Sequence, residues 1–463
     1  MSKKFFIHTF GCQMNVHDSE KMASVLEGLG HSRAEDDSSA DIILFNTCTV
    51  REHAHHKAIS EIGRAVIRKK KKPDLIVGVC GCVAQQERDR LFEIYPSLNF
   101  VLGPDQIHRL KKFTQKWRVD SEQGTGGVVI AAELIDDPDE YNWKYLNDIP
   151  LVTGHRSQVT AFVTIMKGCN NHCSFCIVPK VRGSEISRPA DDIINEIKRL
   201  TAIGIKEVTL LGQNVNSYKS LQPPFSKRGG GGITPFVNLL QNISTETGIQ
   251  SIRYTSPHPK DLGDDLIEEH AANPKLCSHM HLPLQAGSDR VLRLMKRSYN
   301  KKQFIIKAAR LRERVPRIDI TTDVIVGFPG ETESEFKDTL DVVREVAFDG
   351  MFAFKYSPRP GTKAADLKDD VPQEEKESRL ARLLDLNASI WKERTERLIG
   401  TVQEVLVEGV SKKQFFTNGE CQLTGRSFAN KIVNFAGNLN LVGHIVTVEI
   451  ISAGMNSLKG KIV

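Results

Sequence analysis

The sequence contains no apolar run long enough to cross a bilayer. Its longest candidates, Ile42–Phe45 and Leu75–Val79, have only the length of strands. The N-terminal residues show no hydrophobic leader or cleavage signal, so we expect a cytoplasmic protein without a membrane partner. Apolar residues make up 40% of the chain and charged residues 26%, which is typical of a globular protein, and 463 residues predict two to four domains.

The chain also lacks a strong charge of either sign and a plausible disulfide framework. Its net charge of +6 permits a nucleic-acid partner without requiring one. The densest basic run, Arg68–Lys72, is either a solvated helix end or a patch that contacts phosphates. Nine cysteines, an odd number in a chain without a signal peptide, argue against disulfides. Reduced thiols are therefore available as metal ligands.

Three of the cysteines lie in one short segment after an apolar run. Cys169, Cys173 and Cys176 have the spacing Cys-x3-Cys-x2-Cys. Three thiolates can hold three corners of a [4Fe–4S] cluster and leave the fourth iron open. An open iron can bind a small molecule and deliver an electron to it. The segment therefore indicates a radical enzyme.

The first 147 residues alternate between strand and helix patterns, which predicts an α/β domain with an open parallel sheet. The predicted helices are His17–Leu29 and His53–Arg68, and the predicted strands are Phe5–Thr9, Asp41–Phe45, Leu75–Val79 and Phe100–Leu102. Residues 119–150 lose this pattern and are interpreted as a linker with an irregular segment, with a domain boundary near residue 147.

Three further cysteines follow three different predicted strands. Cys12, Cys48 and Cys82 each come just past a strand end, and ligands of parallel sheets bind beyond the carboxyl ends of strands. The recurrence favours a second metal cluster over chance. Cys80 is an alternative candidate ligand to Cys82, but its position in an apolar run favours a place in the hydrophobic core. Cys277 and Cys421 are interpreted as bystanders.

Residues 148–392 contain six further βα repeats, which predict a partial (β/α)6 barrel rather than an open sheet. Its predicted strands are Ala161–Met166, Glu207–Leu211, Ser251–Thr255, His279–Leu284, Asp319–Val326 and Met351–Tyr356. Polar residues follow these strands, among them Gln213, Ser256 and Gln285. The run Gly229–Gly232 lacks the context of a phosphate-binding loop and is interpreted as a surface insertion.

Residues 393–463 predict a small five-strand β-barrel, a fold that either binds nucleic acid or is purely structural. The predicted strands are Val402–Glu408, Gln414–Thr417, Lys431–Phe435, Ile445–Ile451 and Leu458–Val463. The basic residues of this segment, which favour RNA binding, are Lys412, Lys413, Arg426, Lys431, Lys459 and Lys461.

These motifs carry a family resemblance. Cys169–Cys176 resembles the cluster motif of radical S-adenosylmethionine (SAM) enzymes. Together with Phe10–Asn15, Asn46–Glu52 and Gly81–Gln85, it resembles the methylthiotransferase family, whose last domain is the TRAM module. The branch that methylthiolates N6-dimethylallyladenosine in tRNA is the most similar one, on segments 50–54, 211–218, 256–259 and 283–288. The sequence departs from many relatives at Pro179-Lys180-Val181 and in its tetraglycine insertion.

The resemblance implies two [4Fe–4S] clusters and SAM as cofactors. Cys169, Cys173 and Cys176 would hold the radical-generating cluster, whereas Cys12, Cys48 and Cys82 would hold an auxiliary cluster that carries sulfur. Phe175, Gln213, Ser256 and Gln285 are the candidate SAM contacts. SAM would serve both as methyl donor and as the source of a 5′-deoxyadenosyl radical. We assign no acid–base catalytic residue, because the C2–H bond of adenine is not activated for proton removal.

The implied substrate is a tRNA anticodon stem-loop carrying N6-dimethylallyladenosine, and the implied partner is an external electron donor. Lys69–Lys72, Arg182 and the C-terminal lysines are candidate phosphate contacts. The sister branches act on threonylcarbamoyladenosine in tRNA or on an aspartate of a ribosomal protein. Val50-Arg51-Glu52 argues against them. An RNA-binding module with structural clusters is a further alternative.

Overall fold

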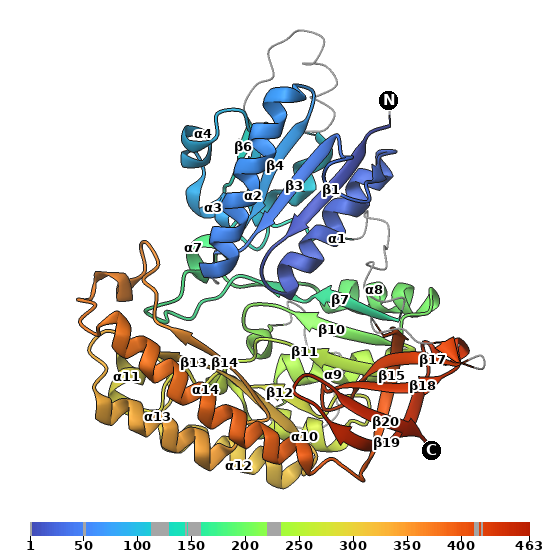
Figure 1. The fold of residues 1–463 in the computed structure, drawn as a ribbon, viewed down its shortest axis with the longest axis vertical. Coiled ribbons are helices and arrows are strands. Elements are labelled where there is room, and N and C mark those ends of the chain that lie inside the picture. Colours follow the sequence, from blue (N-terminus) through green and yellow to red (C-terminus); the bar gives the residue numbers. More distant parts are fainter. Residues whose placement is uncertain are drawn as a thin grey trace. The chain divides into compact units, whose positions relative to one another are not determined.

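The computed structural model describes residues 2–49, 52–112, 129–143, 146, 159–219, 233–411, 416–417 and 420–463. The chain forms two compact units (Figure 1). Unit 1 comprises residues 1–152, 166–171 and 177–187, and unit 2 comprises residues 153–165, 172–176 and 188–463. The predicted features at Val50-Arg51, Gly229–Gly232, Lys412 and Lys413, and the boundary at 147, lie outside the described residues.

Unit 1 contains the predicted open parallel sheet, with six strands in the order β2-β1-β3-β4-β5-β6. The strands are β1 (Lys4–Thr9), β2 (Ser32–Arg33), β3 (Ile42–Thr47), β4 (Ile76–Gly81), β5 (Phe100–Leu102) and β6 (Val129–Ala131). Strand β6 corrects our interpretation of residues 119–150 as irregular. It has three residues, too few for a periodic signal in the sequence, and is defined by pairing with β5.

Helices cover both faces of this sheet. Helix α1 (Gln13–Gly28) and the 3-10 helix η1 (Pro104–Arg109) pack on one face, and α2 (Glu52–Lys71), α3 (Cys82–Glu87) and α4 (Arg90–Ile94) on the other. Each face has its own core, with Phe45 and Ile62 on the side of α2 and Leu44 and Leu26 on the side of α1. A strand buried on both faces reads as a continuous apolar run, which is why β3 and β4 were recognisable.

Unit 2 contains the six predicted barrel strands in sequential order. They are β7 (Thr160–Thr164), β10 (Glu207–Leu211), β11 (Ser251–Tyr254), β12 (His279–His281), β13 (Asp319–Val326) and β14 (Gly350–Lys355). They form the parallel sheets β7-β10-β11 and β12-β13-β14, and a bridge between Ile252 and Leu276 joins the two. The partial (β/α)6 barrel is therefore confirmed.

The remaining elements of this region are helices and short connections. The helices of unit 2 are α8 (Ala190–Ala202), α9 (Pro235–Glu246), α10 (Asp264–Ala272), α11 (Asp289–Leu294), α12 (Lys301–Arg314), α13 (Glu333–Val346) and α14 (Gln373–Glu396). Its 3-10 helices are η2 (Val215–Ser217), η3 (Pro259–Asp261) and η4 (Lys363–Asp366). Unit 1 receives β8 (Met166–Lys167), α7 (Val178–Arg182) and β9 (Ile186–Ser187).

The C-terminal segment folds into the predicted five-strand barrel, but one of the barrel strands was not predicted. The barrel closes in the order β15-β19-β20-β18-β17, and β17 pairs back to β15. Its strands are β15 (Val402–Val410), β17 (Glu420–Ser427), β18 (Ile432–Gly437), β19 (Ile445–Ala453) and β20 (Leu458–Ile462). The described part of the segment predicted as Gln414–Thr417 is the two-residue β16 (Phe416–Thr417), and we missed β17. A further 3-10 helix, η5 (Leu439–Leu441), precedes β19.

Two basic side chains attach the C-terminal barrel to the (β/α)6 barrel within unit 2. Arg253 on β11 forms an ion pair with Glu207 at 2.8 Å and donates to the backbone oxygen of Ser427 at 2.8 Å. Lys431 Nζ lies 3.0 Å from Asp319 Oδ2 and 3.0 Å from the backbone oxygen of Asp349. Lys431 therefore links the two barrels, which argues against its predicted contact with phosphates.

Candidate metal centres

Cys12, Cys48 and Cys82 lie beyond the carboxyl ends of three adjacent strands. Cys12 caps the N-terminus of α1, which follows β1. Cys48 comes directly after β3, and Cys82 is the first residue of α3 after β4. Because β1, β3 and β4 are parallel neighbours, their carboxyl ends share one sheet edge. The predicted placement of the three cysteines is therefore confirmed.

Glycines make room for two of these cysteines. Gly11 and Gly81 directly precede Cys12 and Cys82, with φ of 121° and 87°, which other residues rarely adopt. A Cβ on Gly11 would lie 2.4 Å from the Cβ of Cys48. A Cβ on Gly81 would lie 2.6 Å from the backbone oxygen of Thr47. Only glycine lets these chain segments come this close together.

A buried amide pair holds the same sheet edge together. Asn15 Nδ2 donates to Asn46 Oδ1 at 3.1 Å and to the backbone oxygen of Thr47 at 3.1 Å. Asn46 Nδ2 donates in return to the backbone oxygen of Asn15 at 2.7 Å. Asn15 Oδ1 also accepts from the backbone N–H of Cys12 at 3.3 Å. These bonds fix the turn that carries Cys12 against the strand end that precedes Cys48.

The three thiols are close enough to affect one another electrostatically. Burial raises the pKa of Cys82 to about 12; the Arg182 guanidinium opposes this shift, whereas Cys48 and Cys12 add to it. Among the described residues, no group of three or more His, Cys, Asp or Glu side chains is placed to bind a single metal ion. The thiolates of a cubane bind separate irons, so they need not converge on one point. Cys12, Cys48 and Cys82 therefore fit a cluster whose positive iron ions offset the free-energy cost of ionising buried thiols.

Arg182, at the end of α7, is buried beside this trio. Its Nη2 lies 2.8 Å from Asp18 Oδ2, and both side chains are less than a tenth exposed. Helix α7 packs on α3 through Ile177, Val181 and Cys82. This burial argues against the predicted contact of Arg182 with tRNA phosphates. Its guanidinium instead brings a positive charge next to Cys82.

Cys80 lies inside β4 and is fully buried in the core on the side of α1. Burial raises the pKa of its thiol well above the ordinary range. This position agrees with the predicted core role. Cys421 likewise lies in the core of the C-terminal barrel, and Cys277 is buried beside Ser251.

The Cys169–Cys176 segment is divided between the two units. In unit 1, the backbone N–H of Cys169 donates to the oxygen of Gly183 at 3.1 Å. In unit 2, the backbone N–H and the hydroxyl of Ser174 donate to the oxygens of Met295 and Leu294 at 3.1 and 2.7 Å. The second half of the segment is thus attached to the end of α11.

Arg297 is a site residue that the sequence did not reveal. Its Nη1 donates to Cys173 Sγ at 3.3 Å, and its Nε donates to Tyr299 Oη at 2.9 Å. Tyr299 Oη in turn donates to the backbone oxygen of Pro283 at 2.8 Å. No spacing rule links Arg297 to a cysteine 124 residues away.

We expect Arg297→Gln to lower the reduction potential of the cluster held by Cys173. A cationic donor to a ligating sulfur stabilises the more negative, reduced state, and hydrogen bonds to sulfur set cluster potentials. A redox titration followed by electron paramagnetic resonance measures the shift. The matched control is Arg293→Ala, an exposed arginine on α11. Equal potentials in wild type and Arg297→Gln would contradict the assignment.

Three of the four predicted SAM contacts lie at the carboxyl ends of barrel strands. Gln213, Ser256 and Gln285 follow β10, β11 and β12, and Phe175 is half-buried in the cysteine segment. Ser256 and Gln285 have φ of 61° and 71°, an uncommon conformation for such residues. Strained backbone of this kind concentrates at functional sites. No described contact assigns them to a ligand.

Neighbouring motif residues hold these loops in place. Asn216 Nδ2 donates to the backbone oxygen of His258 at 3.0 Å, and the backbone N–H of His258 donates to Asn216 Oδ1 at 2.7 Å. Asn214 Nδ2 donates to Asp261 Oδ2 at 3.0 Å. Burial lowers the pKa of His258 to about 2, with the positive charge of Arg297 adding to the shift. The loops that follow β10 and β11 therefore form one hydrogen-bonded layer around a neutral histidine.

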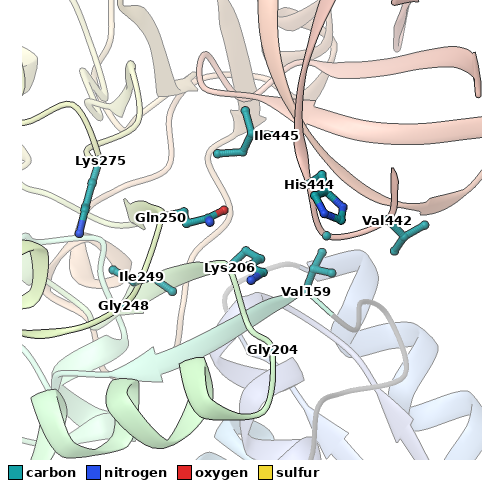
Figure 2. Close-up of a pocket in the computed structure, with 11 residues that line it drawn as sticks. Val159, Gly204, Lys206, Gly248, Ile249, Gln250, Lys275, Val442, His444 and Ile445 are labelled. Atoms are coloured by element: carbon teal, nitrogen blue, oxygen red, sulfur yellow. The ribbon is translucent and has the colours of Figure 1, made fainter. Parts of the chain in front are cut away.

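A separate cleft of about 860 Å³ lies at the opposite ends of the barrel strands (Figure 2). Val159, Lys206, Gln250 and Lys275 line it, and each precedes the start of a strand by one to four residues. His444 and neighbouring residues of the C-terminal barrel complete the lining. Its ionisable side chains, Lys206, Lys275 and His444, are all basic, which suits an anion.

Three family models match the chain. Residues 4–103 match "Uncharacterized protein family UPF0004", residues 163–343 match the radical SAM superfamily, and residues 396–463 match the TRAM domain. Among the described residues, no helix is long and apolar enough to span a membrane.

Curated relatives match over the full length. A protein of Geobacter metallireducens is 47% identical over 461 residues, 99% of this chain and 98% of its own. One of Geotalea uraniireducens is 44% identical over 462 residues, covering 99% of both chains. One of Neisseria gonorrhoeae is 44% identical over 463 residues, 100% of this chain and 99% of its own. All three are named tRNA-2-methylthio-N(6)-dimethylallyladenosine synthase.

Solved structures share the fold at low sequence identity. The radical SAM methyltransferase TsrM from Kitasatospora setae, with tryptophan and a SAM analogue bound, has a TM-score of 0.54 at 15% identity. The match covers 78% of this chain and 74% of that one. A second structure of the same enzyme, with cobalamin and a [4Fe-4S] cluster, has a TM-score of 0.52 at 14% identity, over 79% and 74% of the two chains.

Proposed function

This chain belongs to the tRNA-2-methylthio-N(6)-dimethylallyladenosine synthase family, and on that premise we propose that it attaches a methylthio group to C2 of N6-dimethylallyladenosine next to the tRNA anticodon. It is a radical SAM methylthiotransferase with two [4Fe–4S] clusters. The observation that carries the proposal is the presence of two cysteine trios, of which Cys12, Cys48 and Cys82 share one sheet edge.

When bound, SAM and the cluster of Cys169, Cys173 and Cys176 would supply the radical chemistry, and the auxiliary cluster would supply the sulfur. The residues of this chain position and tune those groups. Cys12, Cys48 and Cys82 hold the auxiliary cluster, with Arg182 supplying positive charge beside Cys82. Cys169, Cys173 and Cys176 hold the other cluster, and Arg297 donates to the sulfur of Cys173.

Gln213, Ser256 and Gln285 bind polar groups of SAM, and Phe175 borders its adenine. Their place at the strand ends of a barrel supports this assignment. We expect Gln285→Gly to weaken SAM binding about tenfold, the effect of losing about one hydrogen bond. Glycine keeps the backbone with φ of 71° unstrained, so folding is preserved. Equilibrium dialysis against labelled SAM measures the loss, and unchanged affinity would remove Gln285 from the site.

The RNA contacts lie on basic residues that the fold leaves accessible. Lys459 and Lys461 of the TRAM domain are exposed, and the cleft with Lys206, Lys275 and His444 is basic. Lys70 at the end of α2 is exposed, whereas Lys72 forms an ion pair with Asp41 at 2.7 Å. Binding through phosphates weakens steeply with salt. An external protein donates the electrons, and the enzyme works in the cytoplasm.

An anaerobic reaction tests the substrate. The reconstituted enzyme is incubated with SAM, a reductant and a stem-loop that carries N6-dimethylallyladenosine, and the nucleosides are then analysed by mass. We expect the mass of the prenylated nucleoside to rise by one methylthio group. If the prenylated nucleoside stays unmodified while a threonylcarbamoylated stem-loop or a ribosomal protein gains that mass, the enzyme acts on that alternative substrate instead.

A further inference from the structure

Strand β14 carries two aromatic side chains that are unusually exposed. Phe352 is 54% exposed and Phe354 is 38% exposed, although phenylalanine is mostly buried in folded proteins. Strand residues alternate between the two faces of a sheet, so Phe352 and Phe354 lie on one face and Met351, Ala353 and Lys355 on the other.

The contacts of Lys355 identify the two faces. Lys355 Nζ lies 2.9 Å from Glu377 Oε1 on helix α14, so the face with Lys355 is turned towards that outer helix. Phe352 and Phe354 therefore face the inside of the (β/α)6 barrel. In the parallel register, Phe352 is paired with Asp323 and Phe354 with Ile325 of β13. Figure 1 shows β13 and β14 side by side next to α14.

The other side chains of this face are mostly polar, and they include the two carboxylates Asp319 and Asp323. The rings of His281 and Phe352 lie 6.2 Å apart and are edge-on. His281 Nε2 lies 3.2 Å from Asp323 Oδ2, and His281 Nδ1 lies 3.0 Å from Thr321 Oγ1. No lysine or arginine occurs on this face of the described strands β12–β14.

The face that carries Phe352 and Phe354 also borders the edge of the barrel. In the described part of the chain, β14 pairs only with β13 and ends the order β12-β13-β14. The carboxyl ends of the same strands carry Gln285 and its strained backbone. Phe354, one residue before the end of β14, therefore lies near these strand ends.

We propose that Phe352 and Phe354 bind the dimethylallyl group of the substrate adenosine and thereby select prenylated tRNA, an inference that rests on the proposed function. A prenyl chain is apolar and branched, and burying it against two aromatic rings removes apolar surface from water. A threonylcarbamoyl group would instead place its carboxylate near Asp323 with no lysine or arginine on this face to pair with it. The two phenylalanines are specificity-determining residues.

The test compares two anticodon stem-loops that differ only in the prenyl group. We expect Phe352→Ala to lower kcat/KM for the prenylated stem-loop about tenfold to a hundredfold, the fold-change that corresponds to burying one such side chain. Turnover of the unprenylated stem-loop should not change, so the preference collapses. SAM cleavage without RNA should stay at the wild-type rate, and Phe352→Leu should restore most of the preference.

The matched control is Ile306→Ala on α12, because Ile306 is also 54% exposed but lies on a helix. This variant should keep the wild-type preference. If Phe352→Ala retains the preference while wild type modifies the prenylated stem-loop, the inference is wrong and the proposed function stands. If wild type modifies neither stem-loop, the proposed function itself fails.

Discussion

Replacing Cys12, Cys48 or Cys82 by alanine should abolish methylthio transfer while SAM cleavage persists. The three thiols share one edge of the unit 1 sheet, whereas Cys173 and Cys176 belong to unit 2. Each variant should therefore lose one cluster and keep the other, a change from about eight irons per chain to about four. Iron analysis, 5′-deoxyadenosine release and nucleoside mass measure the three properties in parallel.

Cys80→Ala is the matched control for these variants. Cys80 lies two residues from Cys82 but inside β4, where it is fully buried in a core cluster. Its variant should keep about eight irons and both activities. Loss of a cluster in Cys80→Ala would mean that the third ligand is misassigned. Loss of SAM cleavage in Cys12→Ala would mean that the two trios do not have separate duties.

Replacing Arg182 by methionine should destabilise unit 1 by about 3–5 kcal/mol, because it leaves the buried carboxylate of Asp18 without its partner. Both side chains are less than a tenth exposed, so solvent cannot take over the role of the guanidinium. We also expect weaker retention of the auxiliary cluster, because Arg182 supplies the positive charge beside Cys82. Chemical denaturation of the apoprotein and iron analysis after reconstitution measure the two effects.

This prediction separates a structural arginine from an RNA-binding one. Asp18→Asn combined with Arg182→Met removes both charges and should recover much of the lost stability. Lys180→Met is the surface control, because Lys180 is exposed on the same helix. If Arg182→Met folds with wild-type stability and only raises the KM for tRNA, the residue contacts phosphates after all.

The cysteine positions were predictable because two local signals coincide. Strands buried on both faces read as apolar runs, and thiols recur at the point where three of those runs stop. The order of β1, β3 and β4 as neighbours, which the sequence left open, decides that the three thiols are adjacent along that edge. The fold class could be predicted for the same reason, since alternating strands and helices imply parallel sheets.

The features that escaped prediction depend on long-range pairing. Arg182 meets Asp18 across 164 residues of sequence, and Arg297 meets Cys173 across 124. Strand β17 escaped because its outward residues Gln422, Thr424 and Arg426 are polar and its inward residues include Gly425, which leaves only Cys421 and Leu423 as an apolar signal. Strand β17 is part of the barrel because it pairs with β15 and β18, which lie apart from it in the sequence.

We propose that this enzyme removes the hydrogen at C2 of prenylated adenosine and replaces it with sulfur. The most direct measurement uses a stem-loop with deuterium at C2 of that base and follows 5′-deoxyadenosine by mass. We predict one deuterium in 5′-deoxyadenosine for each methylthiolated nucleoside formed. A methylthiolated product that keeps its deuterium, or 5′-deoxyadenosine without deuterium during turnover, would contradict this reaction.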